Sequence, residues 1–205
     1  PEALENAVRL AALAIETGAK YSDLLRRSEL DPLTNARNRY AFDRALDLAI
    51  EKGKESGNNF GLIYLDLDGF KQVNDQFGHQ MGDRYLQETV TRLGAHLRPN
   101  DLLARLGGDE FAVLVTNLST GAEIDEIVQR LQTCFDTPFR LGKVVIPVSA
   151  SIGCAVYPED ATTQSALLDC ADIRMYKAKG EKKRAPAGPR IVVDADSAKN
   201  ERWGT

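Results

Sequence analysis

A glycine pair, Gly107–Gly108, constrains the fold of this 205-residue chain more than any other feature. It lies between two short apolar runs in RLGGDEFAVL, residues 105–114. Because glycine readily adopts the backbone that a two-residue hairpin turn requires, the pattern predicts two antiparallel strands joined at this pair. The turn accounts for the glycines but not for the acids that follow, Asp109 and Glu110. If both begin the returning strand, their side chains point to opposite faces of the sheet, and we expect them to have different roles.

A second pair of acids follows another apolar run. The segment Phe60–Leu65 is typical of a buried strand, and it ends in Asp66 and Asp68. Two residues apart in an extended chain, these carboxylates lie on the same face. Acids at strand ends are often simple solvated caps, whereas buried ones require a partner or a metal. Carboxylates from two strand ends suit Mg²⁺, which takes few protein oxygens and completes its shell with water and phosphate.

The rest of the chain predicts an α/β (α+β) fold. Apolar residues at helical spacing indicate helices from about Tyr40, over 83–97, over 124–135 and over 165–179. The β-rich stretch 143–158 adds one or two strands. This order favours a central, mostly antiparallel sheet flanked by helices over a doubly wound parallel sheet.

Three segments are expected along the chain. Residues 1–27 carry an apolar stripe and are interpreted as an N-terminal signalling or linker helix, a stalk either packed on the domain or paired with its twin in a coiled coil. The domain itself spans 28–184. Residues 185–205 form a polar tail that is partly ordered at most, with RIVVDAD at 190–196 as a candidate strand. Because the first residue is proline, a sensory domain is expected upstream.

Charge and cysteine content exclude several classes of function. The formal net charge of −4 and the pI near 5.3 argue against a nucleic-acid-binding surface. No apolar run approaches the roughly 20 residues of a membrane span, so we expect no membrane contact by this segment and a cytoplasmic location. Cys134, Cys154 and Cys170 fit no metal-ligand spacing and are expected to be reduced thiols.

Five motifs in order resemble the GGDEF family of diguanylate cyclases. They are DPLTNARNR at 31–39, DLDGFKQVNDQFGHQMGD at 66–83, GGDEF at 107–111, SIGCAV at 151–156 and ADIRMYKAK at 171–179. The resemblance covers roughly residues 28–184. It implies a palm-like fold shared with nucleotide cyclases, and the condensation of two GTP into cyclic di-GMP with release of two pyrophosphates.

The resemblance also implies a metal site and a catalytic set. Asp66, the main-chain oxygen of Leu67 and Asp109 correspond to the ligands of two Mg²⁺ ions, which Mn²⁺ could replace. Glu110 would assist the metal or the attacking 3′-hydroxyl. Lys71 would supply positive charge to the transition state.

Substrate-binding residues follow from the same resemblance. Asn74 and Asp83 correspond to the residues that read guanine, with His79 lining the pocket, although either of the first two could simply cap a helix. The bare backbone of Gly107 and Gly108 would lie against the nucleotide. The phosphate-binding residues are Lys179 and Lys183.

The chain departs from the family pattern at two places. The family usually continues after Lys179 as x-x-G-R-N, whereas this chain has Lys182 for the glycine and Lys183 for the arginine. A lysine keeps the charge of arginine but loses its bidentate phosphate geometry. Asn35 stands where the first motif usually has glycine, and asparagine tolerates a left-handed backbone.

Regulation and assembly are also implied. RPND at 98–101 resembles the family's inhibitory R-x-x-D site for the product, with Arg98 and Asp101 as ligands and Arg130 as an auxiliary one; alternatively, Pro99 simply ends a helix. A two-fold symmetric product requires two domains, so a homodimer is expected. The competing hypotheses are a catalytically weak GGDEF module that binds GTP or cyclic di-GMP as an effector, and another cyclase or polymerase with a similar palm-like fold.

Overall fold

A five-stranded mixed sheet forms the centre of the computed structural model, which describes residues 24, 29–142, 144–184 and 192–193. The strand order is β1 (Arg37–Asn38), β3 (Leu102–Gly107), β4 (Glu110–Leu118), β2 (Asn59–Leu67) and β7 (Ala150–Tyr157). All neighbours are antiparallel except β1 and β3, which are parallel. The predicted α/β class with a mostly antiparallel sheet is therefore confirmed.

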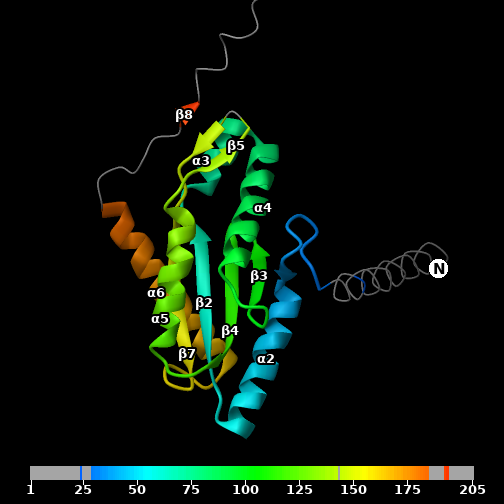
Figure 1. Ribbon diagram of the computed structural model, residues 1–205, viewed down its shortest axis with the longest axis vertical. Coiled ribbons are helices and arrows are strands. Elements are labelled where there is room, and N and C mark those ends of the chain that lie inside the picture. Colours follow the sequence, from blue (N-terminus) through cyan, green and yellow to red (C-terminus); the bar gives the residue numbers. More distant parts are fainter. Residues whose placement is uncertain (1–23, 25–28, 143, 185–191, 194–205) are drawn as a thin grey trace, which may run out of the picture.

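Helices cover both faces of this sheet (Figure 1). One face packs against α2 (Arg39–Ser56) and α6 (Gln164–Arg184), and the other against α4 (His79–Ala95) and α5 (Glu123–Gln132), which continues into the 3-10 turn Thr133–Phe135. Alternate residues of β2 enter the two cores, with Leu62 in one and Ile63 in the other. A strand buried on both faces needs a continuous apolar run, and Phe60–Leu65 supplies it.

Helix α3 (Phe70–Phe77) and strand β5 (Phe139–Leu141) were not predicted from the sequence, whereas β6 (Val144–Ile146) lies within the predicted β-rich stretch 143–158. Helix α3 is only eight residues long and lies between Gly69 and Gly78, both of which have positive φ. A small second sheet contains β5, β6 and β8 (Val192–Val193). Strand β8 pairs with β6, so the candidate strand in the tail is partly realised.

The predicted N-terminal helix lies outside the described residues apart from Leu24, and so does most of the tail. The segment limits at 27/28 and 184/185 therefore stay predictions. Among the helices that the structure describes, none is long and apolar enough to cross a membrane.

Candidate metal and nucleotide site

The hairpin turn consists of Gly108 and Asp109, one residue later than predicted. Gly107 pairs with Glu110 in the ladder between β3 and β4, which leaves only Gly108 and Asp109 unpaired. A register shift between Arg105 and Gly107 displaces the turn, and both glycines take positive φ, at 151° and 52°. The prediction of a Gly107–Gly108 turn was therefore wrong, although glycine remains favoured at both positions.

This register also changes how the two signature acids are oriented. Glu110 lies opposite Asp66 in the ladder between β2 and β4, and residues that pair across a ladder share a face. Its carboxylate lies 3.7 Å from Arg39 of α2. Asp109 lies in the turn, where its carbonyl oxygen accepts a hydrogen bond from the Leu67 backbone N–H at 3.2 Å. The expectation of alternating faces along one strand is therefore wrong, because Asp109 is not a strand residue.

Asp66 and Asp109 form a carboxylate pair at the end of β2. Asp66 is buried, with 9% of its surface exposed, and accepts a hydrogen bond from Lys179 Nζ at 2.6 Å. Burial raises the pKa of Asp109, and the nearby Asp66 carboxylate raises it further. The hydrogen bond to Asp66 in turn raises the pKa of Lys179. The carboxylates of Asp66 and Asp109 therefore lie close together, and the Lys179 ammonium group of helix α6 lies beside them.

The donor set fits a hard divalent cation. It offers two carboxylates and the adjoining main chain at Leu67, all of them oxygen ligands. Within the described ranges no three His, Cys, Asp or Glu side chains gather as a metal site. Mg²⁺ is typically held by one or two carboxylates together with substrate phosphates and water, so the arrangement suits it.

Asp68 is held separately from this pair. Its carboxylate accepts hydrogen bonds from Ser149 Oγ at 2.8 Å, Ser151 Oγ at 2.7 Å and Lys182 Nζ at 3.2 Å. Although burial acts to raise the pKa of Asp68, the hydrogen bonds from Ser151, Ser149 and Lys182 lower it overall. Asp66 belongs to β2 and Asp68 follows the end of that strand at Leu67. Each accepts a hydrogen bond from a lysine of α6, Asp66 from Lys179 and Asp68 from Lys182.

The predicted base-reading residues lie where α3 meets α4. A methyl group added to Gly82 would lie only 1.9 Å from Asn74 Oδ1, so Gly82 allows α4 to approach Asn74. Asp83 follows in the chain and is exposed, as is His79 at the first position of α4. Helix α4 has Gly78 at its N-cap and no side-chain cap, so neither Asn74 nor Asp83 caps it.

The predicted phosphate-binding lysines come from two helices. Lys71 is exposed in the first turn of α3, and Lys179 reaches the carboxylate pair from α6. Lys183 belongs to α6, but its side chain lies outside the described part of the structure. A methyl group added to Gly153 of β7 would lie 2.1 Å from the Ala171 carbonyl oxygen, so this glycine lets α6 lie close to the sheet.

The RPND segment forms a tight turn between α4 and β3. The Arg98 N–H donates to Asp101 Oδ2 at 2.9 Å, and the Arg98 guanidinium pairs with Glu123 of α5 at 2.7 Å. Arg130 of α5 donates to the His96 carbonyl at 2.9 Å. Helix α4 ends at Ala95, before Pro99. A pocket of about 480 Å³ adjoins the turn, and Asp101 is among its lining residues.

Sequence reasoning missed several residues of the site. It overlooked the positioning glycines Gly82 and Gly153 and the contacts of Ser149 and Ser151 with Asp68. A glycine inside a helical or strand pattern signals close backbone approach, and that signal was available at both glycines. The serine contacts had no local signal, because Ser149 and Asp68 are 81 residues apart in the chain.

Comparison with known proteins identifies relatives of this chain. Residues 28–185 match the family model described as "Diguanylate cyclase, GGDEF domain". The chain is 37% identical over 179 residues to the diguanylate cyclase TpbB of Pseudomonas aeruginosa, a match that covers 84% of this chain and 41% of that protein. The chain therefore spans about two fifths of the length of this relative.

Two solved structures share the fold. An N-terminally truncated mutant of TpbB from Pseudomonas aeruginosa, comprising only the GGDEF domain, superposes with a TM-score of 0.72 at 40% identity, covering 74% of this chain and 89% of that one. The coiled coil and GGDEF domain of DgcB from Caulobacter crescentus, in complex with cyclic di-GMP, gives a TM-score of 0.69 at 26% identity, covering 87% and 95%.

Proposed function

The chain belongs to the GGDEF family of diguanylate cyclases, and on that premise we propose that it is itself a diguanylate cyclase. It would join two GTP molecules into cyclic di-GMP and release two pyrophosphates. The observation that carries the proposal is the carboxylate pair Asp66 and Asp109, set beside Lys179 at the end of β2. In each half-reaction the 3′-oxygen of one GTP bonds to the α-phosphorus of the other, its proton leaves, and the bond to pyrophosphate breaks.

Metal ligation is assigned to Asp66, the Leu67 carbonyl oxygen and Asp109. Two bound Mg²⁺ ions would supply Lewis acidity to the phosphates and favour the ionised 3′-hydroxyl. The Lys179 ammonium group lies beside Asp66, and its flexible side chain can reorient toward the phosphates. Lys71 supplies a second positive charge from α3, and Glu110 is assigned to the metal or the 3′-hydroxyl.

Substrate binding is assigned to the junction of α3 and α4 and to the hairpin. The Asp83 carboxylate would accept hydrogen bonds from guanine N1–H and N2–H₂, which adenine cannot offer in that arrangement. The Asn74 amide reads the same edge, and His79 lines the pocket. The glycines of the hairpin give the nucleotide close access to the backbone, with Lys183 as a further phosphate ligand.

Catalysis requires two domains, because each contributes one GTP to a two-fold symmetric product. We assign a homodimer in which the two nucleotides lie antiparallel across the join. The segment 1–27 would set how the domains meet, in response to an upstream sensory domain. Turnover per chain should then rise with chain concentration or with forced dimerisation; turnover indifferent to both would contradict this arrangement.

Product inhibition is assigned to the RPND turn. The Arg98 guanidinium would bind phosphate or the guanine Hoogsteen edge, and Asp101 would accept from guanine. Arg130 lies on the adjacent helix α5, and a pocket opens beside Asp101. The present pairing of Arg98 with Glu123 would have to open for the product to bind.

A product assay tests the proposal directly. The chain is incubated with GTP and Mg²⁺ and cyclic di-GMP is quantified, with Asp109→Ala as the control. We expect product from the unmodified chain and none from the variant. The second candidate, a non-catalytic effector, is favoured only by the altered GEKKR segment at 180–184. Absence of product at high chain concentration, with tight cyclic di-GMP binding that Arg98→Ala abolishes, would establish the effector instead.

A further inference from the structure

Lys182 joins three elements at the end of the sheet. Its Nζ donates to the Ala150 carbonyl oxygen at 2.6 Å and to Asp68 Oδ2 at 3.2 Å. Ser149 and Ser151 hold the same carboxylate, which fixes it as an anchor. This Lys182 contact, made of Lys182, Asp68 and Ala150, thus ties the last turns of α6 to the start of β7 and to the β2–α3 connection.

The position of this contact along α6 determines what it can do. Close packing at Gly153 holds the earlier part of the helix, since an added methyl group would lie 2.2 Å from the Met175 backbone nitrogen. Lys182 lies seven residues further on, about 10 Å along the helix. Between them lies Lys179, whose hydrogen bond to Asp66 also connects α6 to the sheet.

The Lys179 bond is one that the proposed reaction must break. Asp66 Oδ1, the atom that accepts from Lys179, belongs to an assigned metal ligand. A cation bound there and a phosphate nearby would both draw Lys179 away from Asp66. The Lys182 contact uses different acceptors and can persist through that exchange.

We propose that Lys182 is a positioning residue, which keeps the last turns of α6 on the sheet while Lys179 moves from Asp66 to the phosphates. The inference rests on the proposed function and goes beyond it, because Lys182 has no part in the metal, substrate-binding or catalytic assignments made above. The Lys182 contact also connects α6, which carries Lys179, to α3, which carries Lys71, because Asp68 directly precedes Gly69, the N-cap of α3.

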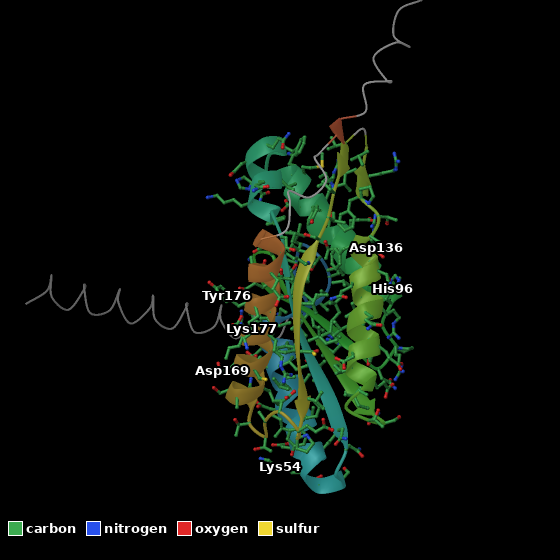
Figure 2. The ribbon with its side chains drawn as sticks, turned by 90° about the vertical axis from the view of Figure 1, so that its left-hand side faces the viewer. Lys54, His96, Asp136, Asp169, Tyr176 and Lys177 are labelled. Carbon is green, nitrogen blue, oxygen red and sulfur yellow. The ribbon has the colours of Figure 1, made fainter. Side chains whose placement is uncertain are left out.

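Hydrogen exchange of the full 205-residue chain tests the contact without turnover. The variants are Lys182→Met, which keeps the length and removes the charge, Lys182→Arg as the conservative rescue, and Lys177→Met as the matched control. Lys177 is exposed on the same helix (Figure 2). Each is measured alone and with Mn²⁺ and a non-hydrolysable GTP analogue.

Lys182→Met should speed exchange of the amides at 179–184 about fivefold, the loss expected for a partly exposed, charge-assisted hydrogen bond. With the analogue bound, the difference from the unmodified chain should grow, because Lys179 no longer supports the helix. Lys177→Met should match the unmodified chain, and Lys182→Arg should recover most of the protection. Equal exchange in the two methionine variants would overturn the inference.

Kinetics distinguish positioning from mere support of the helix. For Lys182→Met we expect kcat to fall about tenfold, the scale of effect that a displaced catalytic cation produces, with KM for GTP within twofold. Faster exchange with unchanged kcat would reduce Lys182 to a structural role and overturn the proposal. A chain that made no cyclic di-GMP would defeat the proposed function, while exchange with the analogue would still decide the Lys182 contact.

Discussion

Replacing Gly82 with alanine should damage the base pocket specifically. The added methyl group would lie 1.9 Å from Asn74 Oδ1 and 2.9 Å from its Cγ, whereas ordinary van der Waals contact begins at 3.4 Å. Asn74 Oδ1 must therefore move by about 1.5 Å, the difference between the 1.9 Å approach and the 3.4 Å at which ordinary contact begins. Asn74 is our proposed guanine reader, so the substitution acts on base recognition through that side chain and leaves the assigned metal ligands unchanged.

The magnitude follows from two opposing effects. Alanine gains about 1 kcal/mol over glycine inside a helix, while overpacking costs about 1–3 kcal/mol, so the net change in unfolding free energy should be small. The loss of a correctly placed hydrogen bond to guanine costs about 1–3 kcal/mol, and a displacement of about 1 Å can cost 10²-fold in rate. We expect kcat/KM for GTP to fall about 10- to 100-fold, mainly through KM.

The matched control is Gly94→Ala in the same helix. A methyl group there meets nothing within 4 Å, so it should raise stability by a few tenths of a kcal/mol up to about 1 kcal/mol and leave KM unchanged. Thermal unfolding, GTP titration and initial rates are measured for both variants. A folded Gly82→Ala protein with the GTP affinity of the unmodified chain would refute our placement of the guanine pocket.

Further predictions concern the metal pair, α6 and one ion pair. Asp109→Asn should leave the fold intact, weaken Mn²⁺ binding in a calorimetric titration and lower kcat by about 10³-fold; unaltered Mn²⁺ affinity would exclude Asp109 as a ligand. Gly153→Ala places a methyl group against backbone atoms of α6 and should lower stability by about 1–3 kcal/mol together with activity, because Lys179 moves with the helix. The bidentate hydrogen bonds from Arg174, at 2.6 and 2.7 Å, lower the pKa of Asp160. Since that pKa is lower in the folded state than in the unfolded one, the stabilisation is complete above about pH 4 and disappears as pH falls through the folded-state value. Asp160→Asn should therefore cost about 1 kcal/mol at pH 7 and less near pH 2, in urea unfolding at the two pH values; an equal loss at both would contradict an ionic origin.

The long elements were predictable because their apolar patterns are strong. Phe60–Leu65 predicted a buried strand, which the structure shows to be buried on both faces, and the helical stripes placed α2, α4, α5 and α6. Helix α3 escaped prediction because eight residues between two glycines give too short a pattern. Strand β1 has two residues and pairs with β3, across more than sixty residues of chain, which no local signal reveals.

The geometry of the site depends on the register of the β3–β4 hairpin, and the periodicity of apolar residues in the sequence does not determine that register. The glycines and acids of the signature were correctly seen as a hairpin with a carboxylate near Asp66. A one-residue shift of the turn nevertheless placed Asp109 outside the strand and Glu110 opposite Asp66. Since alternation applies only to residues of a strand, it could not predict the direction of Asp109. The Lys182 contact depends on residues 32 and 114 positions apart, and only the folded chain brings them together.

The central claim is that Asp66 and Asp109 serve GTP condensation between two domains. The most direct test measures cyclic di-GMP formed from GTP and Mg²⁺ across a range of chain concentrations that spans dimer formation, beside Asp109→Ala. We predict a rate per chain that rises with concentration and then saturates, and no product from the variant. Product formed equally well by Asp109→Ala, or none from the unmodified chain when it is dimeric, would contradict the account.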